Sequence, residues 1–271
     1  MPVSTALPRC LHAAIRALRV QFFVAGALFA TWGVHVPSVK VHYGLGEASL
    51  AIAMMAMGIG SVVALLYAGK VLARHTPRTV MPVLAVVATV AIGSLLAPSG
   101  YASLLGLMLA YGIAAALFDV AMNDEAAMIE RETMRPLMSG FHGMFSLGGM
   151  AGAAAWSLLA TAGATPMQHL VGAAAVLVVL AFAASAFMLR HERRPDAGGA
   201  PLSIPRGALL LLGLLAATGL IAEGAMYDWS VLYLRQELDA PAATAGLAYA
   251  SFSGAMAGGR FGGGGRRWPC C

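Results

Sequence analysis

Charge and cysteine are both scarce in this sequence. Only 11% of its 271 residues are charged and 59% are hydrophobic, whereas a typical soluble domain is about 25% charged and about 45–50% apolar. So few polar groups could not cover the surface of a soluble fold. The composition therefore excludes a soluble globular domain and a disordered chain, and it indicates an integral membrane protein. The three cysteines, Cys10, Cys270 and Cys271, provide neither a disulfide framework nor a metal-binding spacing.

Motifs of enzymatic chemistry are also missing from the chain. The sequence has no His-Glu-x-x-His, no Gly-x-Ser-x-Gly and no Gly-x-x-x-x-Gly-Lys-Ser/Thr. We therefore expect no enzyme, no cofactor, no metal site and no ATP-driven pump. The formal net charge of +5 is spread over several segments rather than one face, so we expect no nucleic-acid partner either.

Long runs without charge fill most of the chain. A helix needs about 20 apolar residues to cross a bilayer, and these runs have about that length. The interval 137–189 contains no Asp, Glu, Lys or Arg, and residues 163–166 supply the turn that divides it. We expect an all-α integral membrane protein with eight spans, over residues 20–39, 48–69, 79–97, 99–121, 137–162, 170–189, 207–227 and 240–259.

The basic residues predict how these spans are oriented. Lys and Arg accumulate in cytoplasmic loops of membrane proteins. If the N-terminus is cytoplasmic, 15 of the 17 basic residues lie on the cytoplasmic side of the membrane, and only Lys40 and Arg235 lie on the opposite side. We therefore expect a multi-pass protein of the cell inner membrane whose N-terminus and whose basic segment 190–206 are cytoplasmic.

Five segments carry a resemblance to a known family. They are FATWGV at 29–34, GKVLARHTPR at 69–78, FDVAMN at 118–123, SGFHGMFSLGG at 139–149 and AEGAMYDWS at 222–230. With these motifs, the chain resembles the major facilitator superfamily and, more narrowly, its fucose-permease-like branch.

The resemblance implies a domain organisation in two halves of six helices each. It implies that residues 1–189 form a complete N-terminal six-helix half, that residues 190–206 are a cytoplasmic linker, and that residues 207–262 are the first two helices of the C-terminal half. The tail 263–271 is atypical, because family members continue there with a loop and four more spans. We expect a transporter truncated after the eighth span by a shifted reading frame; the alternative is a natural short tail.

The loop after the second span departs from the family pattern. Gly69, Arg74 and Arg78 match it, but Ala73 replaces an aspartate and Pro77 replaces a second glycine. The resemblance implies a gating role for the three matching residues. The alternative is that the two arginines only fix the orientation in the membrane.

Asp119 is the most informative ionisable residue. A charged group inside a membrane costs about 2.5–3.5 kcal/mol on insertion scales, so a cavity or a partner usually explains it. Asn123 follows Asp119 at i+4 on the same helical face. In the transporters that the chain resembles, a carboxylate here faces the central cavity and handles protons and substrate, which implies that role for Asp119. The alternative is an acid at the membrane interface.

Glu223 is the second embedded acid. Counted from Gly207 as the cytoplasmic start, it lies in the outer third of its span. Tyr227 shares its helical face and joins it as a candidate for lining a cavity. Asp228 and the neighbouring Trp229 are expected at the outer membrane interface, where aromatic residues gather.

Three further residues are candidates for the cavity. The branch often has an acid in the first span, but here Trp32 and His35 occupy that region, and His142 stands in span five. His35 could titrate near neutral pH, although a lone histidine in a helix more often packs through a hydrogen bond. Span five also has a small-xxx-small spacing that favours close helix packing, at Gly143, Gly148 and Gly152.

These features predict a secondary active transporter. Its solute would be small and polar, with a sugar-like compound favoured by the resemblance, and symport with a proton is expected through a buried carboxylate. The partners are then the solute, the proton and the lipid bilayer; the oligomeric state is unknown. The alternative is a truncated or degenerate membrane protein without transport activity, or a membrane partner subunit.

Overall fold

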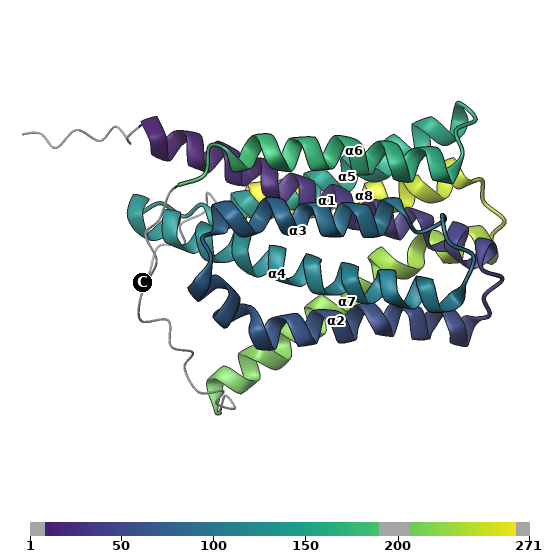
Figure 1. Ribbon diagram of the computed structural model, residues 1–271, viewed down its shortest axis with the longest axis horizontal. Coiled ribbons are helices and arrows are strands. Elements are labelled where there is room, and N and C mark those ends of the chain that lie inside the picture. The colour runs from purple at the N-terminus through teal and green to yellow at the C-terminus, as the bar shows by residue number, and fades with distance from the viewer. Residues whose placement is uncertain (1–8, 190–205, 264–271) are drawn as a thin grey trace, which may run out of the picture.

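The computed structural model describes residues 9–189 and 206–263, and these residues form eight helices and no strand (Figure 1). The all-α fold expected from the sequence is therefore confirmed. The helices are α1 (Arg9–His42), α2 (Glu47–Arg74), α3 (Pro77–Gly93), α4 (Tyr101–Thr133), α5 (Met138–Thr161), α6 (Pro166–Ser185), α7 (Ala208–Gln236) and α8 (Ala242–Gly263).

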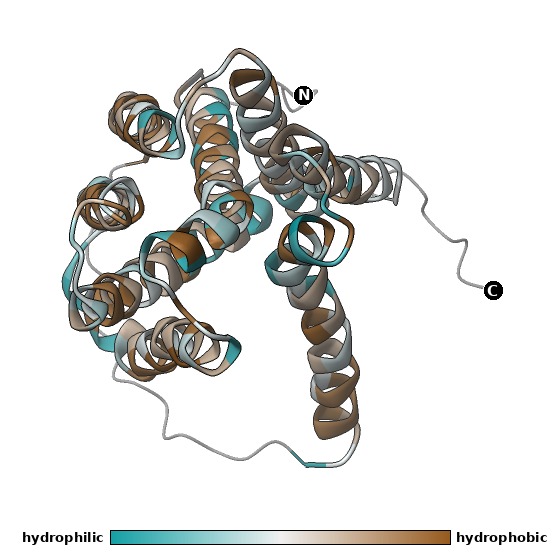
Figure 2. Cartoon of the chain, turned by 90° about the vertical axis from the view of Figure 1, so that its right-hand side faces the viewer, coloured by the Kyte–Doolittle hydropathy of each residue, from teal (hydrophilic) through white to brown (hydrophobic). Residues whose placement is uncertain are grey.

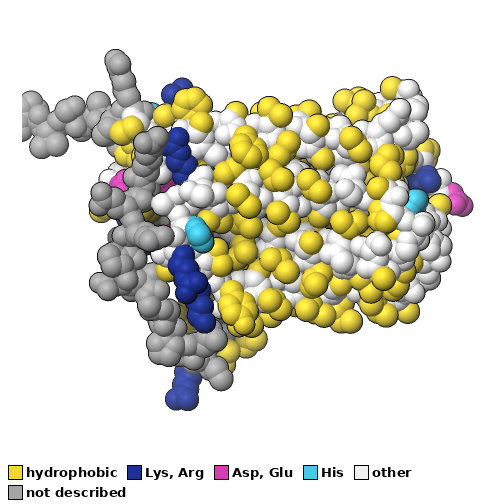
Figure 3. Space-filling model, viewed as in Figure 1, with side chains coloured by type: hydrophobic (Ala, Val, Ile, Leu, Met, Phe, Trp, Pro, Cys, Tyr) yellow, Lys and Arg dark blue, Asp and Glu magenta, His cyan; other side chains and the backbone are white. Residues whose placement is uncertain are grey.

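Six of these helices are long and apolar enough to cross a membrane: α1, α2, α4, α5, α6 and α7. The helix α3 is apolar but shorter, and α8 is rich in alanine and glycine. Hydrophobic side chains cover the middle of the bundle, while lysine and arginine gather chiefly at the end where α1 begins (Figure 3). The chain is a multi-pass membrane protein. We call the end with Arg16, Arg74 and Arg131 the basic end, and the opposite end, where α1 leads into α2, the cavity end.

Several helices extend beyond the apolar runs. The charged segment after the fourth span continues α4 to Thr133, and Met134 ends it in the left-handed conformation (φ 50°). This extension buries Ala126 and Ile129 on one side, so an amphipathic pattern sustains the helix after the apolar run has ended. Hydropathy alone therefore marks the helix ends of this protein poorly.

The start of α6 shows a local signal that outweighs hydropathy. We expected this span to begin at residue 170, and the helix that contains this start, α6, already begins at Pro166. The Thr165 hydroxyl accepts a hydrogen bond from the Gln168 amide, and the Gln168 side chain accepts one from the Thr165 amide. This capping box, followed by proline at the first helical position, fixes the start of the helix.

The first six helices pack around α1. It contacts α5 and α6, while α4 packs against α2 and α3, and α3 also contacts α6. The approach of α1 to α5 depends on glycine: a Cβ atom at Gly148 would clash with the Phe23 carbonyl oxygen, and one at Gly26 with the Phe145 carbonyl oxygen. The packing role expected for the glycines of span five is thus confirmed at Gly148.

The last two helices are held by α1 and α5. The helix α8 packs along α5, and α7 contacts α8 and α1. Only the second half of α7 takes part, because residues 208–222 are all exposed in the described structure. Figure 2 shows this first half of α7 leaning away from the other helices.

Candidate functional site

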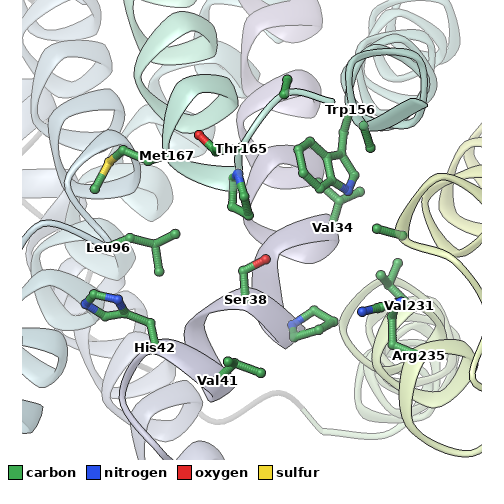
Figure 4. Close-up of a pocket in the computed structure, with 15 residues that line it drawn as sticks. Val34, Ser38, Val41, His42, Leu96, Trp156, Thr165, Met167, Val231 and Arg235 are labelled. Atoms are coloured by element: carbon green, nitrogen blue, oxygen red, sulfur yellow. The ribbon is translucent and has the colours of Figure 1, made fainter. Parts of the chain in front are cut away.

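A cavity of about 630 Å³ lies at the cavity end, between α1, α5 and α6 on one side and α7 and α8 on the other (Figure 4). Its outer residues stand at helix ends, among them His42 of α1, Arg235 of α7 and Ala242 of α8. Deeper along α1 and α7 it is lined by Val34 and Val231. The cavity thus separates the first six helices from the last two at this end.

A histidine pair is buried beside the cavity. Nε2 of His35 lies 2.8 Å from Nδ1 of His169, so one ring donates its N–H to the other. Trp156, which lines the cavity, packs against both rings, with centroids 4.4 Å from His35 and 5.4 Å from His169. His35 is therefore hydrogen-bonded within the packed interior, and its partner is a residue that the sequence did not reveal.

Arg260 joins three helices near the basic end. From α8, its guanidinium donates to both carboxylate oxygens of Glu223 on α7, at 2.9 and 3.2 Å. It also donates to the Ser146 hydroxyl on α5, at 2.5 Å, and its carbonyl accepts a hydrogen bond from Ser139, also at 2.5 Å. Both side chains of the ion pair are about one-fifth exposed. We call Arg260, Glu223 and Ser146 the Arg260 cluster.

This cluster corrects one expectation. We expected Glu223 in the outer third of its span, but it lies at the middle of α7 and pairs with Arg260 close to the end of α8. The count along the seventh span was wrong because α7 continues to Gln236, well beyond the apolar run.

Asp119 and His142 lie close to this cluster. Nδ2 of Asn123 donates to the Asp119 carboxylate at 3.1 Å and to its carbonyl at 2.9 Å, so the pair expected at i+4 does form. The His142 ring is within electrostatic reach of Asp119, Glu223 and Arg260. The structure therefore places Glu223 of α7 and His142 of α5 beside the arginine of α8, and Asp119 of α4 within electrostatic reach of His142.

Tyr227 belongs to an aromatic layer between α1, α7 and α8, whereas Trp32 packs in a separate core cluster, chiefly with residues of α1 to α6. The Tyr227 ring lies 5.9 Å from Phe29, 4.7 Å from Tyr249 and 5.1 Å from Phe252, measured between centroids. Trp32 is completely buried. This layer lies between the cavity and the Arg260 cluster along α7.

Asp228 is placed differently from its expected position at the membrane interface. Its Oδ1 atom is buried, and its carboxylate neighbours the Trp32 indole. The adjacent Trp229 is 41% exposed and does face outward. Successive residues of a helix point about 100° apart, so the two side chains occupy different environments.

The residues of the expected gating loop stand apart from this site. Gly69 lies in the last turns of α2, Arg74 ends that helix, and Arg78 is the second residue of α3. Because α2 packs against α4, and α3 against α4 and α6, this loop lies away from the Arg260 cluster. Within residues 9–189 and 206–263, no group of three His, Cys, Asp or Glu side chains is arranged to hold a metal ion.

Comparison with known proteins identifies a family and several relatives. Residues 19–269 match the family model of the Major Facilitator Superfamily. The chain is similar to an uncharacterized MFS-type transporter of Yersinia pestis, with 35% identity over 90% of this chain and 64% of the relative. It is also similar to an uncharacterized transporter of Sinorhizobium fredii, with 31% identity over 89% of this chain and 64% of the relative. A third relative is the membrane protein MosC of Rhizobium meliloti, with 25% identity over 92% of this chain and 61% of the relative. The chain thus spans less than two thirds of the length of these curated relatives.

Proposed function

Because the chain belongs to the Major Facilitator Superfamily, whose members are transporters and not enzymes, we propose that it works as a secondary active transporter of a small polar solute. The expectation that it is no enzyme is confirmed by this membership. The solute would pass between the first six helices and α7–α8 by alternating access. A sugar-like solute is favoured by the resemblance to the fucose-permease-like branch.

The observation that carries this proposal is the asymmetry of the helix interface. The cavity lies between the two groups of helices at one end, while the Arg260 cluster joins α5, α7 and α8 near the other. This is the arrangement of a transporter open on one side and closed on the opposite side. In the reverse state, the bond of Arg260 to Ser146 would break as the basic end opens between α5 and α7–α8.

The orientation, the coupling and the gating belong to the same proposal. The gathering of lysine and arginine at one end supports a cytoplasmic basic end in the inner membrane (Figure 3). Asp119, held by Asn123 and facing His142, would bind a proton coupled to the solute. The loop with Arg74 and Arg78 would gate at the basic end.

The truncation expected after Gly262 stays a prediction, and residues 264–271 and 190–205 lie outside the described residues.

A second function is favoured by one observation. The first half of α7 makes no buried contact within the described residues, and leucines such as Leu209 and Leu220 are fully on its surface. A membrane partner subunit, or a protein that does not transport, would present such a face to another chain. In a transporter the same face would contact lipid, so a transport assay is needed to distinguish a transporter from a partner subunit.

The deciding experiment is solute-driven proton movement in proteoliposomes. The purified 271-residue chain is reconstituted into vesicles that contain a pH-sensitive dye, and a panel of monosaccharides is added outside. A transporter coupled to protons acidifies the lumen only when its solute is present, and an uncoupler abolishes the signal. Protein-free vesicles are the control. Absence of both proton movement and labelled-sugar exchange would favour the non-transporting alternative.

A further inference from the structure

Asp228 is an embedded acid that the proposed transport cycle does not yet use. It lies on the cavity half of α7, and Val231, one turn later on the same side of the helix, lines the cavity. Its neighbour Trp32, on α1, is completely buried. Asp228 therefore lies one helical turn from the cavity lining, where α7 packs against α1.

Several buried polar atoms in the described parts of α1, α7 and α8 lack a hydrogen bond of ordinary geometry. Buried atoms without a hydrogen bond of ordinary geometry, among the residues described, include Trp32 Nε1, Asp228 Oδ1, Tyr227 OH, Ser230 Oγ and Ser253 Oγ. Trp32, Tyr227 and Ser253 are more than nine-tenths buried. Folded proteins pair almost all such atoms, so an unpaired one requires an explanation, such as bound water or an ion. Of these atoms, Trp32 Nε1 and Asp228 Oδ1 belong to neighbouring side chains across α1 and α7.

The charge around Asp228 is not balanced by the protein. The groups that face it are the Trp32 indole from α1, the Tyr111 phenol from α4 and the Tyr249 phenol from α8, and none of these is cationic. On its own helix, Glu223 is already neutralised by Arg260. A carboxylate in such an environment is stable when a positive charge joins it, and the smallest carrier of that charge is a proton.

We infer that Asp228 is a second proton-binding carboxylate of the transporter, reached from the cavity and distinct from Asp119. A proton from cavity water adds to a carboxylate oxygen of Asp228 and removes its negative charge. On deprotonation, the carboxylate accepts a hydrogen bond from the Trp32 N–H. The role in coupled transport rests on the proposed function, but proton binding at Asp228 does not.

Trp32 offers a direct readout, because its indole is next to the carboxylate. The full chain is purified in detergent with Trp156, Trp229 and Trp268 replaced by Phe, so that the fluorescence reports Trp32 alone. This also removes the signal of Trp156, which packs against two titratable histidines. Fluorescence is then recorded over about pH 4 to 9, a range that spans the ordinary carboxyl and imidazole titrations.

The expected result is one titration step that depends on Asp228. Asp228→Asn, which keeps the size of the side chain, should abolish the step, while Asp119→Asn should leave its midpoint unchanged. If Asp228→Asn does not fold, Asp228→Glu keeps a carboxyl and should move the midpoint. A fluorescence that does not change with pH, a step that persists in Asp228→Asn, an unmoved midpoint in Asp228→Glu, or a step lost in Asp119→Asn would each overturn the inference. The titration needs no transport, so a failed flux assay beside a normal titration contradicts the transport proposal alone.

Discussion

Replacement of Arg260 gives the sharpest test of the closed end of the interface. Its guanidinium is shared between Glu223 on α7 and Ser146 on α5, so Arg260→Ala removes the polar connection between these helices. The variant also leaves the Glu223 carboxylate without its cation, four-fifths buried in the bundle.

The magnitude follows from the burial of the pair. Removing one partner of a fully buried ion pair costs about 3–5 kcal/mol, and an exposed pair contributes about 0–1 kcal/mol. With each side chain about one-fifth exposed, we expect Arg260→Ala to destabilise the protein by about 2–4 kcal/mol, including about 1 kcal/mol for the hydrogen bond to Ser146. Glu223→Ala should cost a similar amount, because it leaves the arginine unpaired.

A double-mutant cycle separates the ion pair from general packing. Unfolding of the detergent-solubilised protein is followed by circular dichroism for the wild type, the two single variants and the double variant. If the pair acts as described, the double variant is hardly less stable than Arg260→Ala. It is about 1 kcal/mol less stable than Glu223→Ala, because the hydrogen bond of Arg260 to Ser146 is then lost as well. The matched control is Arg235→Ala at the cavity end, whose exposed arginine donates only to the Ala240 carbonyl and should cost less than about 1 kcal/mol. Additive losses for Arg260 and Glu223 would refute the coupling.

Three further outcomes are expected. Gly148→Ala should destabilise the protein by at least about 1–3 kcal/mol in thermal unfolding, because the added Cβ meets the backbone of α1. Gly172→Ala is the control and should not destabilise it, because a Cβ there meets nothing within 4 Å. Equal stabilities of the two variants would contradict the close packing. Asp119→Asn should abolish solute accumulation driven by a pH gradient while solute exchange survives, and unchanged accumulation would remove Asp119 as a proton site. In a cysteine-free background, an impermeant reagent applied outside intact cells should label a cysteine at Ser99 but not one at His75, and the reverse pattern would invert the proposed orientation.

The helices were predictable because apolar composition determines them almost alone. In a bilayer the backbone must bond within each helix, so every long charge-free run becomes one. The ends were less predictable, since polar residues extend helices beyond the lipid region. The segment that continues α4 to Thr133 is charged but amphipathic, and the start of α6 was encoded in the capping box of Thr165 and Gln168 rather than in hydropathy.

The candidate site was predictable only where its contacts are local. Asp119 and Asn123 are one helical turn apart, so their hydrogen bond could be expected from spacing. The partners of Glu223 and His35 lie 37 and 134 residues away along the chain, and no pattern in a single sequence indicates which helices adjoin. Asp228 was assigned to the interface because Trp229 follows it, although neighbouring helical residues point in different directions.

The cavity and the Arg260 cluster are two ends of one helix interface. The same helices, α5, α7 and α8, line the cavity at one end and meet at Arg260 near the other. A packed helix is stiff, so a tilt of α7 and α8 together against α5 that narrows the cavity must separate Arg260 from Ser146, while the pair of Arg260 with Glu223 moves as a unit. The Asp228 site lies between these two ends, where the tilt changes its surroundings least. A proton bound there would remain with the carboxylate while access to it passes from the cavity end to the basic end, as alternating access requires.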